Sequence, residues 1–431
     1  MAHPTTSSTQ IAMPVVLLTN PDSGILTNLL LKHAGSTVEI DIELNNRLNL
    51  FTGDNGLGKT FLLDVIWWLF TGTWATQPIL SLADDTPEIQ AKFAGIQRTD
   101  EWLRYQYDFN SQRWPQITTF DSNLVIYMQS NDNFSVWDAT RQSGRIYQFD
   151  EDSLWHGLQQ NDKTVCNGLI RDLNRWQYQP NQDDSSPFQQ FSRVLKHLSP
   201  HPGEEIRIGQ PTRISLDEVL DYPTLDLVYG NVPIAHISAG MKRILNLAYL
   251  LVWSWYEHQQ AAKLRRKEPT QQLILLVDEL ETHLHPRWQR AILPAILRVM
   301  EAMQVNVSIQ TMITTHSPLV LASAEPHFDV NQDKLFLFEL EDRNVTLNEM
   351  LWSKQGDAVN WLVSDIFGLP QARSTEAEVA INAANQLMDG EDLAGLPEYL
   401  QTKEKIHQEL LRLLAGHDRF WPRWIMKTQI S

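Results

Sequence analysis

The sequence has a single cysteine, no long apolar run and no recognisable secretion signal. An internal disulfide is excluded because Cys166 has no second cysteine to pair with. The most apolar stretches, FLLDVIWWLF and LAYLLVWSWY, run for about ten residues, whereas a membrane-spanning helix needs about twenty. The opening stretch MAHPTTSSTQIAMPVV lacks the basic start, apolar core and small-residue cleavage site of a signal peptide. We therefore expect a cytoplasmic protein without a transmembrane segment.

Positive charge is also scarce, with 35 basic residues against 52 acidic ones and a formal net charge of −17. This balance argues against bulk electrostatic attraction to nucleic acid or anionic lipid, although a local basic patch can still contact a phosphate backbone. The run KLRRK at residues 263–267 is the clearest such patch. A short charge run at a helix end is more often a solvated surface, so it does not by itself predict nucleic-acid binding.

Alternating strand and helix patterns predict an α/β fold with a largely parallel sheet. We expect four regions: an N-terminal part at 1–80, a Trp- and Gln-rich insertion of mixed α/β structure at 81–205, a second α/β part at 206–345 and a helical C-terminal region at 346–431. Strands are expected at 14–20, 36–44, 47–53, 123–129, 133–137, 273–279 and 308–315, and helices at 88–105, 165–178, from Met241 into the 260s, and from Pro286 to about Met303.

The segment GDNGLGKT at residues 53–60 matches G-x-x-x-x-G-K-[ST] between an expected strand and an expected helix. Glycines let successive backbone N–H groups curl around phosphates, the lysine reaches the outer phosphates and the hydroxyl is offered to Mg²⁺. A chance glycine turn is a poor alternative in this setting. The residues predicted to contact the nucleotide here are Asp54, Asn55, Gly56, Leu57, Gly58, Lys59 and Thr60.

A phosphate loop needs a carboxylate at the end of a neighbouring strand to hold the Mg²⁺ shell. The segment LILLVDELETHLHP provides Asp278 and Glu279 after an apolar strand. We assign Asp278 to the metal and Glu279 to the polarisation or deprotonation of the attacking water. The same segment carries His283 and His285, which are a weak zinc signal because no third ligand is evident.

A third segment, HISAGMKRIL at 236–245, places Ser238 and Gly240 at the start of an expected helix. Exposed N–H groups at such a helix start form an anion site. Taken alone, Ser-Ala-Gly before a helix is more often an ordinary N-cap. Its position forty residues ahead of Asp278 favours the functional interpretation.

The chain contains, in this order, GDNGLGKT, SAGMKR, LLVDELETHLHP and ITTHSP. These segments resemble the phosphate loop, signature motif, catalytic strand and switch histidine of ABC-type ATPases, and most closely those of the SMC, RecF and OLD branch, often described as AAA-family ATPases. The resemblance implies a P-loop NTPase fold, ATP and Mg²⁺ as ligands, and His316 as the switch histidine. It also implies that two heads sandwich ATP, the phosphate loop of one facing the signature of the other.

Members of this branch carry a glutamine after a strand that contacts Mg²⁺, and Gln129 in LVIYMQSND is the nearest candidate. The abundance of glutamine in this region leaves its register open. Some OLD-like ATPases carry a C-terminal nuclease domain with a D-x-D pair, but Asp-x-Asp does not occur after Ser317. The segment at 361–378 resembles stand-alone ATPases of bacterial antiphage systems, of Septu or PARIS type.

We therefore expect an ATPase that forms a homodimer or higher homo-oligomer and controls a separately encoded nuclease or toxin in antiphage defence. Nucleic-acid binding stays open, and no membrane partner is expected. The first alternative is a RecF-like DNA-repair or chromosome-maintenance ATPase that clamps DNA. The second alternative is the ATPase subunit of a transporter.

Overall fold

A computed structural model of the chain describes residues 24–35, 39–78, 86–94, 101–117, 123–141, 146–180, 183–201, 203–303 and 305–428. The chain divides into two compact units, Met1–Lys354 and Gln355–Ser431. The strand expected at 14–20 lies outside the described residues. Within the described ranges, no helix has the length and apolar content needed to cross a membrane.

An eight-stranded sheet forms the centre of the first unit. Its strands β18, β3, β17, β16 and β6 are parallel neighbours, and antiparallel strands extend both edges. The order across the sheet is β19 (Asn344–Met350), β18 (Asp333–Glu341), β3 (Leu48–Gly53), β17 (Ser308–Thr314), β16 (Gln272–Val277), β6 (Leu124–Met128), β7 (Phe134–Asp138) and β8 (Ile146–Phe149).

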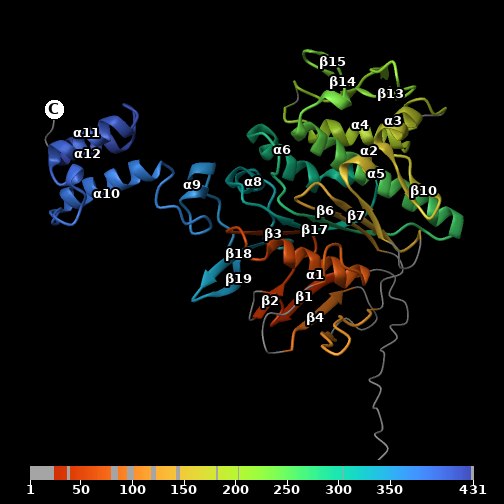
Figure 1. Cartoon of the computed structure of the whole chain (residues 1–431), viewed down its shortest axis with the longest axis horizontal. Helices are drawn as coiled ribbons and strands as arrows, with labels where there is room; N and C mark the ends of the chain where they lie inside the picture. The colour runs from red at the N-terminus through yellow and green to blue at the C-terminus, as the bar shows by residue number, and fades with distance from the viewer. Residues whose placement is uncertain are drawn as a thin grey trace, which may run out of the picture. The chain divides into compact units, whose positions relative to one another are not determined.

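A second, antiparallel sheet lies on one side of the first, with helix α1 (Lys59–Thr71) between them (Figure 1). Its order is β2 (Glu39–Glu43), β1 (Ile25–Lys32), β4 (Glu88–Ala94) and β5 (Leu103–Gln106). Helix α1 is apolar around most of its circumference because both of its sides are covered. The first turn of α1 is thereby fixed directly beyond β3.

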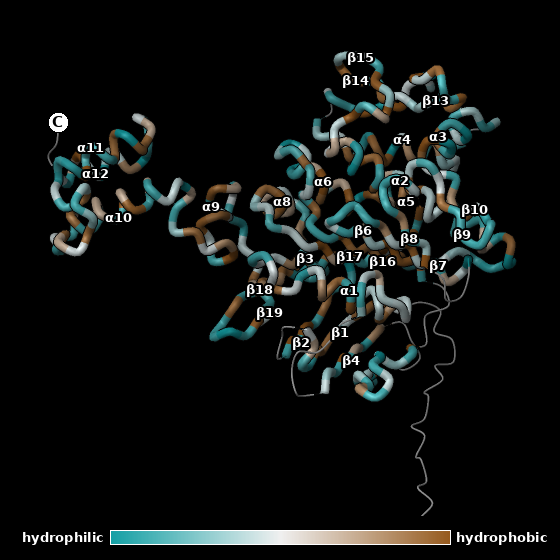
Figure 2. Tube along the Cα trace, viewed as in Figure 1, coloured by the Kyte–Doolittle hydropathy of each residue, from teal (hydrophilic) through white to brown (hydrophobic). Residues whose placement is uncertain are grey.

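The central strands read as continuous apolar runs because helices or a second sheet cover both faces. Every residue of β16 and of β6 is buried. Figure 2 shows the same pattern as hydrophobic colour along the strands at the centre of this unit and hydrophilic colour on the surrounding loops. The strands predicted at 47–53, 123–129, 133–137, 273–279 and 308–315 are confirmed as β3, β6, β7, β16 and β17.

The helix predicted at 88–105 is wrong, because this segment contains β4 and β5. Ile89, Ala91 and Phe93 are buried at a spacing of two, and β4 pairs with β1 along nearly its whole length. A period of two places side chains on one face of a strand, whereas a helix would separate them. The segment at 81–205 thus adds strands to both sheets of the first unit.

Helices cover the other face of the main sheet (Figure 1). Helix α5 (Ala239–Arg265) packs against β6 and α4, as the long helix predicted from Met241 requires. The helix predicted from Pro286 to Met303 is divided at Arg298 into α6 and α7. The remaining helices of this unit are α2 (Glu151–His156), α3 (Leu169–Gln177), α4 (Pro187–Leu198), α6 (Pro286–Leu297), α7 (Val299–Met303) and α8 (Pro318–Ala324).

Short antiparallel strand pairs lie in the connections between α2 and α3 and between α4 and α5. The pairs are β9 (Leu158–Gln160) with β10 (Lys163–Cys166), β12 (Thr212–Arg213) with β13 (Asp221–Tyr222), and β14 (Thr224–Leu227) with both β11 (Arg207–Ile208) and β15 (Gly230–Pro233). The last of these hairpins leads through a short 3₁₀ turn into α5.

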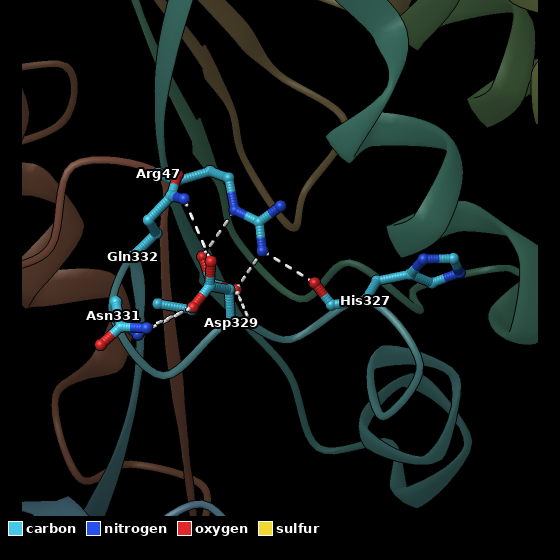
Figure 3. A network of polar contacts seen from close by, with 6 residues as sticks. Arg47, His327, Asp329, Asn331 and Gln332 are labelled. Carbon is cyan, nitrogen blue, oxygen red and sulfur yellow. Dashed lines mark hydrogen bonds and ion pairs between the residues drawn. The ribbon is translucent and has the colours of Figure 1, made fainter.

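A partly buried ion pair ties β3 to β18 just before β3 begins (Figure 3). The Arg47 guanidinium donates from Nε to Asp333 Oδ1 at 2.8 Å and contacts the second oxygen of the same carboxylate. It also donates to the backbone oxygen of His327 at 2.7 Å. The Asp333 side chain is fully buried, so Arg47 supplies the counter-charge that this carboxylate needs.

The second unit is helical and has its own small core. Its helices are α9 (Ala358–Leu362), α10 (Thr375–Asp389), α11 (Lys403–Leu413) and α12 (Phe420–Thr428). Alanines on α10 let α11 and α12 approach closely, and Trp421 and Trp424 fill the space between them. Of the region predicted as helical at 346–431, residues 346–350 belong instead to β19 of the first unit, and the helices begin at Ala358.

Candidate functional site

The glycine-rich loop leaves the end of β3 and enters α1. Gly53 has a φ of 131°, and a Cβ atom at this position would lie 2.3 Å from the backbone oxygen of Phe338. Only glycine fits such a close approach to the neighbouring strand. Beyond it, Asp54, Asn55 and Gly56 are exposed at the tip of the loop. Leu57 and Gly58 are partly buried where the loop joins α1.

The first turn of α1 holds the two polar side chains of the motif. Lys59 is buried, and its Nζ donates to the backbone oxygens of Gly53 at 2.9 Å and Asp54 at 2.6 Å. Burial lowers the pKa of the Lys59 ammonium, while the nearby carboxylates of Asp278 and Glu279 act in the opposite direction. A cation in the curl of the loop, beside a helix start, suits the binding of phosphate.

The Thr60 hydroxyl donates to Asp278 Oδ2 at 2.8 Å, which joins the phosphate loop to the end of β16. The second oxygen, Asp278 Oδ1, accepts from the Thr314 hydroxyl at 2.7 Å. Asp278 is fully buried, so these hydroxyl groups are the polar contacts that stabilise its side chain. The structure thus brings together the loop and the strand carboxylate that the sequence predicted as partners.

The strand register explains this convergence. Val277 lies opposite Ile313 of β17 and Met128 of β6. The next residues along the chain are Asp278, Thr314 and Gln129. They therefore lie together where three neighbouring parallel strands end, at one edge of the sheet. Ligands of open α/β sheets bind outside this carboxyl edge. Gln129 is 5% exposed, and its backbone N–H donates to the Asn133 oxygen at 2.9 Å; its contact with Mg²⁺ stays a prediction.

Glu279 has an unusual backbone conformation for a residue with a side chain. Its φ is 47°, in the left-handed region that non-glycine residues seldom adopt. Its N–H donates to the Thr314 hydroxyl at 2.7 Å, and its carboxylate accepts from the Thr282 hydroxyl at 3.1 Å. Strain of this kind persists only where the surroundings fix it, and it concentrates at functional sites.

His316 follows β17 and is half-buried on the same edge. Its backbone N–H donates to Glu281 Oε1 at 2.5 Å, and the adjacent Thr315 hydroxyl donates to Glu281 Oε2 at 2.7 Å. Burial and the Lys59 ammonium lower the pKa of the imidazole. The ring is therefore neutral near pH 7, where one of its nitrogens donates a hydrogen bond and the other accepts one.

Ser238 and Gly240 begin α5. The exposed Ser238 caps the helix, since its hydroxyl accepts from the Met241 N–H at 3.4 Å. A Cβ atom on Gly240 would lie 2.7 Å from the backbone oxygen of His283, so the helix start and the loop after β16 are in close contact. No hydrogen bond among the described residues joins Ser238 to the phosphate loop within the chain.

The two histidines after β16 have structural partners. His283 Nε2 lies 3.3 Å from Asp132 Oδ2, and the His285 side chain caps α6 by accepting from the Arg287 N–H at 3.3 Å. In the parts of the chain that the structure describes, no cluster of three or more His, Cys, Asp or Glu side chains has the arrangement of a metal site.

Sequence reasoning missed several side chains that hold the site together. Thr314 lies inside the quoted segment ITTHSP and Arg243 inside SAGMKR, but neither residue type carries a signal of its own. The side chains in question are Asp132, Arg243, Glu281, Thr282 and Thr314. Thr282 contacts Glu279, three residues earlier in the same loop, but the partners of the other four lie on other elements, so the chain order alone does not reveal them.

A protein-family model described as "AAA domain, putative AbiEii toxin, Type IV TA system" matches residues 48–322. The chain is 22% identical over 431 residues to the Septu protein PtuA of Bacillus thuringiensis, covering 94% of this chain and 98% of that protein. It is 35% identical over 351 residues to the Septu protein PtuA of Bacillus mycoides strain KBAB4, covering 77% of this chain and 43% of that protein.

Solved structures give weaker similarities. The SMC head domain from Thermotoga maritima is 14% identical, with a TM-score of 0.36 and coverage of 76% of this chain and 99% of that one. The recombination mediator protein RecF is 12% identical, with a TM-score of 0.38 and coverage of 77% and 100%.

The family match spans β3 to α8 and includes the glycine-rich loop, the α5 start, the end of β16 and His316. The predicted P-loop α/β fold and the predicted resemblance to AAA-family ATPases are confirmed, and the chain is similar to Septu proteins, one of the two types that the sequence suggests. Because the matching model covers more than half of the sequence, the chain belongs to this AAA domain family and is an ATPase.

Proposed function

We propose that two copies of the chain hydrolyse ATP at shared sites, where the phosphate loop of one copy faces the α5 start of the other. The observation that carries this proposal is that no hydrogen bond between described residues joins Ser238 at the α5 start to the residues around the phosphate loop. Thr60, Asp278 and Glu279 form one connected group, whereas Ser238 is exposed and makes no hydrogen bond to that group among the described residues. A helix start stabilises the charge of a γ-phosphate only when it lies beside it.

Within the proposed site, each side chain has one role. Backbone N–H groups of the loop and the Lys59 ammonium bind the phosphates. Glu279 accepts the proton of the attacking water, and its fixed backbone directs the carboxylate toward that water. The neutral His316 donates a hydrogen bond to the γ-phosphate. Ser238 of the second copy completes the group of donors around the charge that develops on this phosphate.

The donor set fits Mg²⁺, a hard cation that prefers oxygen ligands. The Thr60 hydroxyl and the Asp278 carboxylate lie 2.8 Å apart at the end of the phosphate loop. We assign these two residues to the metal, with Gln129 as a third contact from the neighbouring strand. Mg²⁺ held by these residues would neutralise part of the charge of the nucleotide phosphates.

We further propose that this ATPase acts in the cytoplasm as a sensor or regulator of a separate nuclease or toxin in antiphage defence. The similarity to Septu proteins over 94% of the chain supports this role. Co-purification with the products of neighbouring genes tests the role, and a chain that binds none of them contradicts it.

A RecF-like DNA clamp is the second candidate. It is favoured by the C-terminal end of α5, where Lys263, Arg265, Arg266 and Lys267 are all exposed. This candidate predicts ATP-dependent DNA binding that weakens as salt increases. Absence of DNA binding at low salt would contradict this candidate function.

Site sharing is tested by mixing two inactive variants. Lys59→Ala removes the phosphate contact, and Ser238→Arg blocks the helix start. A mixed dimer retains one intact site, formed by the phosphate loop of the Ser238→Arg copy and the α5 start of the Lys59→Ala copy. We expect turnover to return in the mixture. The control is a chain that carries both Lys59→Ala and Ser238→Arg. Mixing it with either single variant should not restore turnover, because no intact site can form.

Two results contradict site sharing: full turnover by Ser238→Arg alone, or no recovery of turnover in a mixture whose subunits demonstrably exchange.

The assignment of Glu279 as the base is tested separately. Glu279→Gln should bind ATP and lose roughly 10²- to 10⁴-fold in turnover. Normal turnover by this variant would show that another group accepts the proton.

A further inference from the structure

Arg243 is a buried arginine on the first turns of α5, five residues after Ser238. Its side chain is 3% exposed. Nη2 donates to the backbone oxygens of Asp278 and Glu279, at 3.2 Å in each case. Nη1 donates to Asp132 Oδ1 at 2.8 Å. One guanidinium thus joins α5, the end of β16 and the loop that follows β6.

The contact with Glu279 involves the backbone of the residue with a φ of 47°. The Thr314 hydroxyl accepts from the N–H of Glu279, and the carbonyl oxygen of Glu279 accepts from Arg243 and, at 3.0 Å, from the backbone N–H of Thr282. Both polar backbone groups of this strained residue are therefore fixed by side chains from other elements. A planar guanidinium with several N–H donors in fixed directions can make such contacts simultaneously, which a lysine ammonium cannot reproduce.

Asp132 completes the connection. Its second oxygen lies 3.3 Å from His283 Nε2, and the backbone oxygen of His283 is the atom that approaches Gly240. Arg243 and His283 therefore link the same two segments, α5 and the loop after β16, through a shared carboxylate. Burial lowers the pKa of Arg243, and Asp132 is the largest opposing influence. Asp132 thus stabilises the buried positive charge.

We propose that Arg243 is a positioning residue for Glu279: it fixes the backbone of the proposed base and couples it to the helix that begins with the signature motif. When a partner's nucleotide contacts the α5 start, a displacement of α5 moves the guanidinium and, with it, the carbonyl oxygen of Glu279. This inference rests on the proposed function, because it requires Glu279 to be the base and the α5 start to contact ATP.

The test compares Arg243→Gln and Arg243→Lys with wild type. Arg193→Gln is the matched control, because Arg193 also donates to a backbone oxygen, that of Ala302 at 2.8 Å, but joins α4 to α7. We expect Arg243→Gln to lower kcat by roughly 10- to 100-fold, the range for misplacing a catalytic group by about 1 Å. ATP affinity should stay near wild type, and Arg243→Lys should recover little. Arg193→Gln should keep wild-type kcat.

A merely structural role is distinguished by combining Arg243→Gln with Glu279→Gln. If Arg243 acts through the base, the double variant is no slower than Glu279→Gln alone, because the interaction is already lost. The inference is overturned if the loss of kcat in the double variant is the product of the losses in the two single variants. It is also overturned if Arg243→Gln keeps wild-type kcat. If Arg243→Gln does not fold, Asp132→Asn serves in its place, with a smaller loss of kcat expected; unchanged kcat in this variant overturns the inference.

The outcomes also separate this inference from the proposed function. Normal turnover by Glu279→Gln refutes the base assignment, whatever Arg243 does. Loss of turnover in Glu279→Gln together with wild-type kcat in Arg243→Gln leaves the proposed function standing and removes the positioning role.

Discussion

Thr314 offers the sharpest test of how the site is held, because one hydroxyl group connects its two carboxylate residues. It donates to Asp278 Oδ1 at 2.7 Å and accepts from the Glu279 N–H at 2.7 Å. Both Thr314 and Asp278 are fully buried. Thr314→Val replaces the hydroxyl with a methyl group of similar size and leaves the shape of the side chain almost unchanged.

The expected cost follows from the two groups left without a partner. A hydrogen bond to a charged group contributes about 1.5–3 kcal/mol, and an unsatisfied buried donor costs about 1–3 kcal/mol. The two losses share one hydroxyl and are not fully additive. We expect Thr314→Val to lower the free energy of unfolding by about 2–5 kcal/mol. We also expect kcat to fall by roughly 10- to 100-fold, because the backbone of Glu279 is no longer fixed at its N–H.

The free energy of unfolding is measured by urea titration, and kcat by phosphate release at saturating ATP. Thr314→Ser is the matched control, since it keeps the hydroxyl and removes only the methyl group. It should retain most of the turnover. Equal urea midpoints and equal kcat for the valine and serine variants would refute the reasoning, because the hydroxyl would then connect nothing that stability or turnover requires.

Two other perturbations address stability. Arg47→Ala removes the counter-charge of the buried Asp333 carboxylate, which keeps the Asp329 N–H as a donor at 2.8 Å, and should lower the free energy of unfolding by roughly 3 kcal/mol. Arg213→Ala, which breaks an exposed pair, should cost less than about 1 kcal/mol in the same urea titration. Burial raises the pKa of Asp64 to about 6, so its charged form destabilises the fold, and this cost develops as pH rises from about 4 through 6. Asp64→Asn should therefore increase the urea midpoint at pH 7.5 and much less at pH 4; a gain independent of pH would contradict this assignment.

The order of motifs in the sequence predicts the central part of the site well. The phosphate loop, Asp278 and Glu279 carry their own signals, because glycine spacing and an apolar strand ending in carboxylates are visible along the chain. The structure places Thr60 and Asp278 in contact through the pairing of parallel strands. That contact follows from the fold class and the position of each motif at a strand end.

Other features depend on partners distant in the chain. The segment at 88–105 contains helix-forming residues, and pairing with β1 makes it two strands. Arg243 reads as an ordinary surface cation of a helix, yet its partner Asp132 lies 111 positions away. Local propensity does not encode such contacts, since tertiary pairing overrides it.

The length of α5 has a mechanical consequence. Its 27 residues span about 40 Å at 1.5 Å per residue, so a tilt of about 5° at its first turn moves its last turn by about 3.5 Å. The helix is buried along most of its length and packs against α4 and β6. A small rotation at the Ser238 end of the helix is thereby amplified into a shift of the exposed cationic end, on the scale of a side-chain contact.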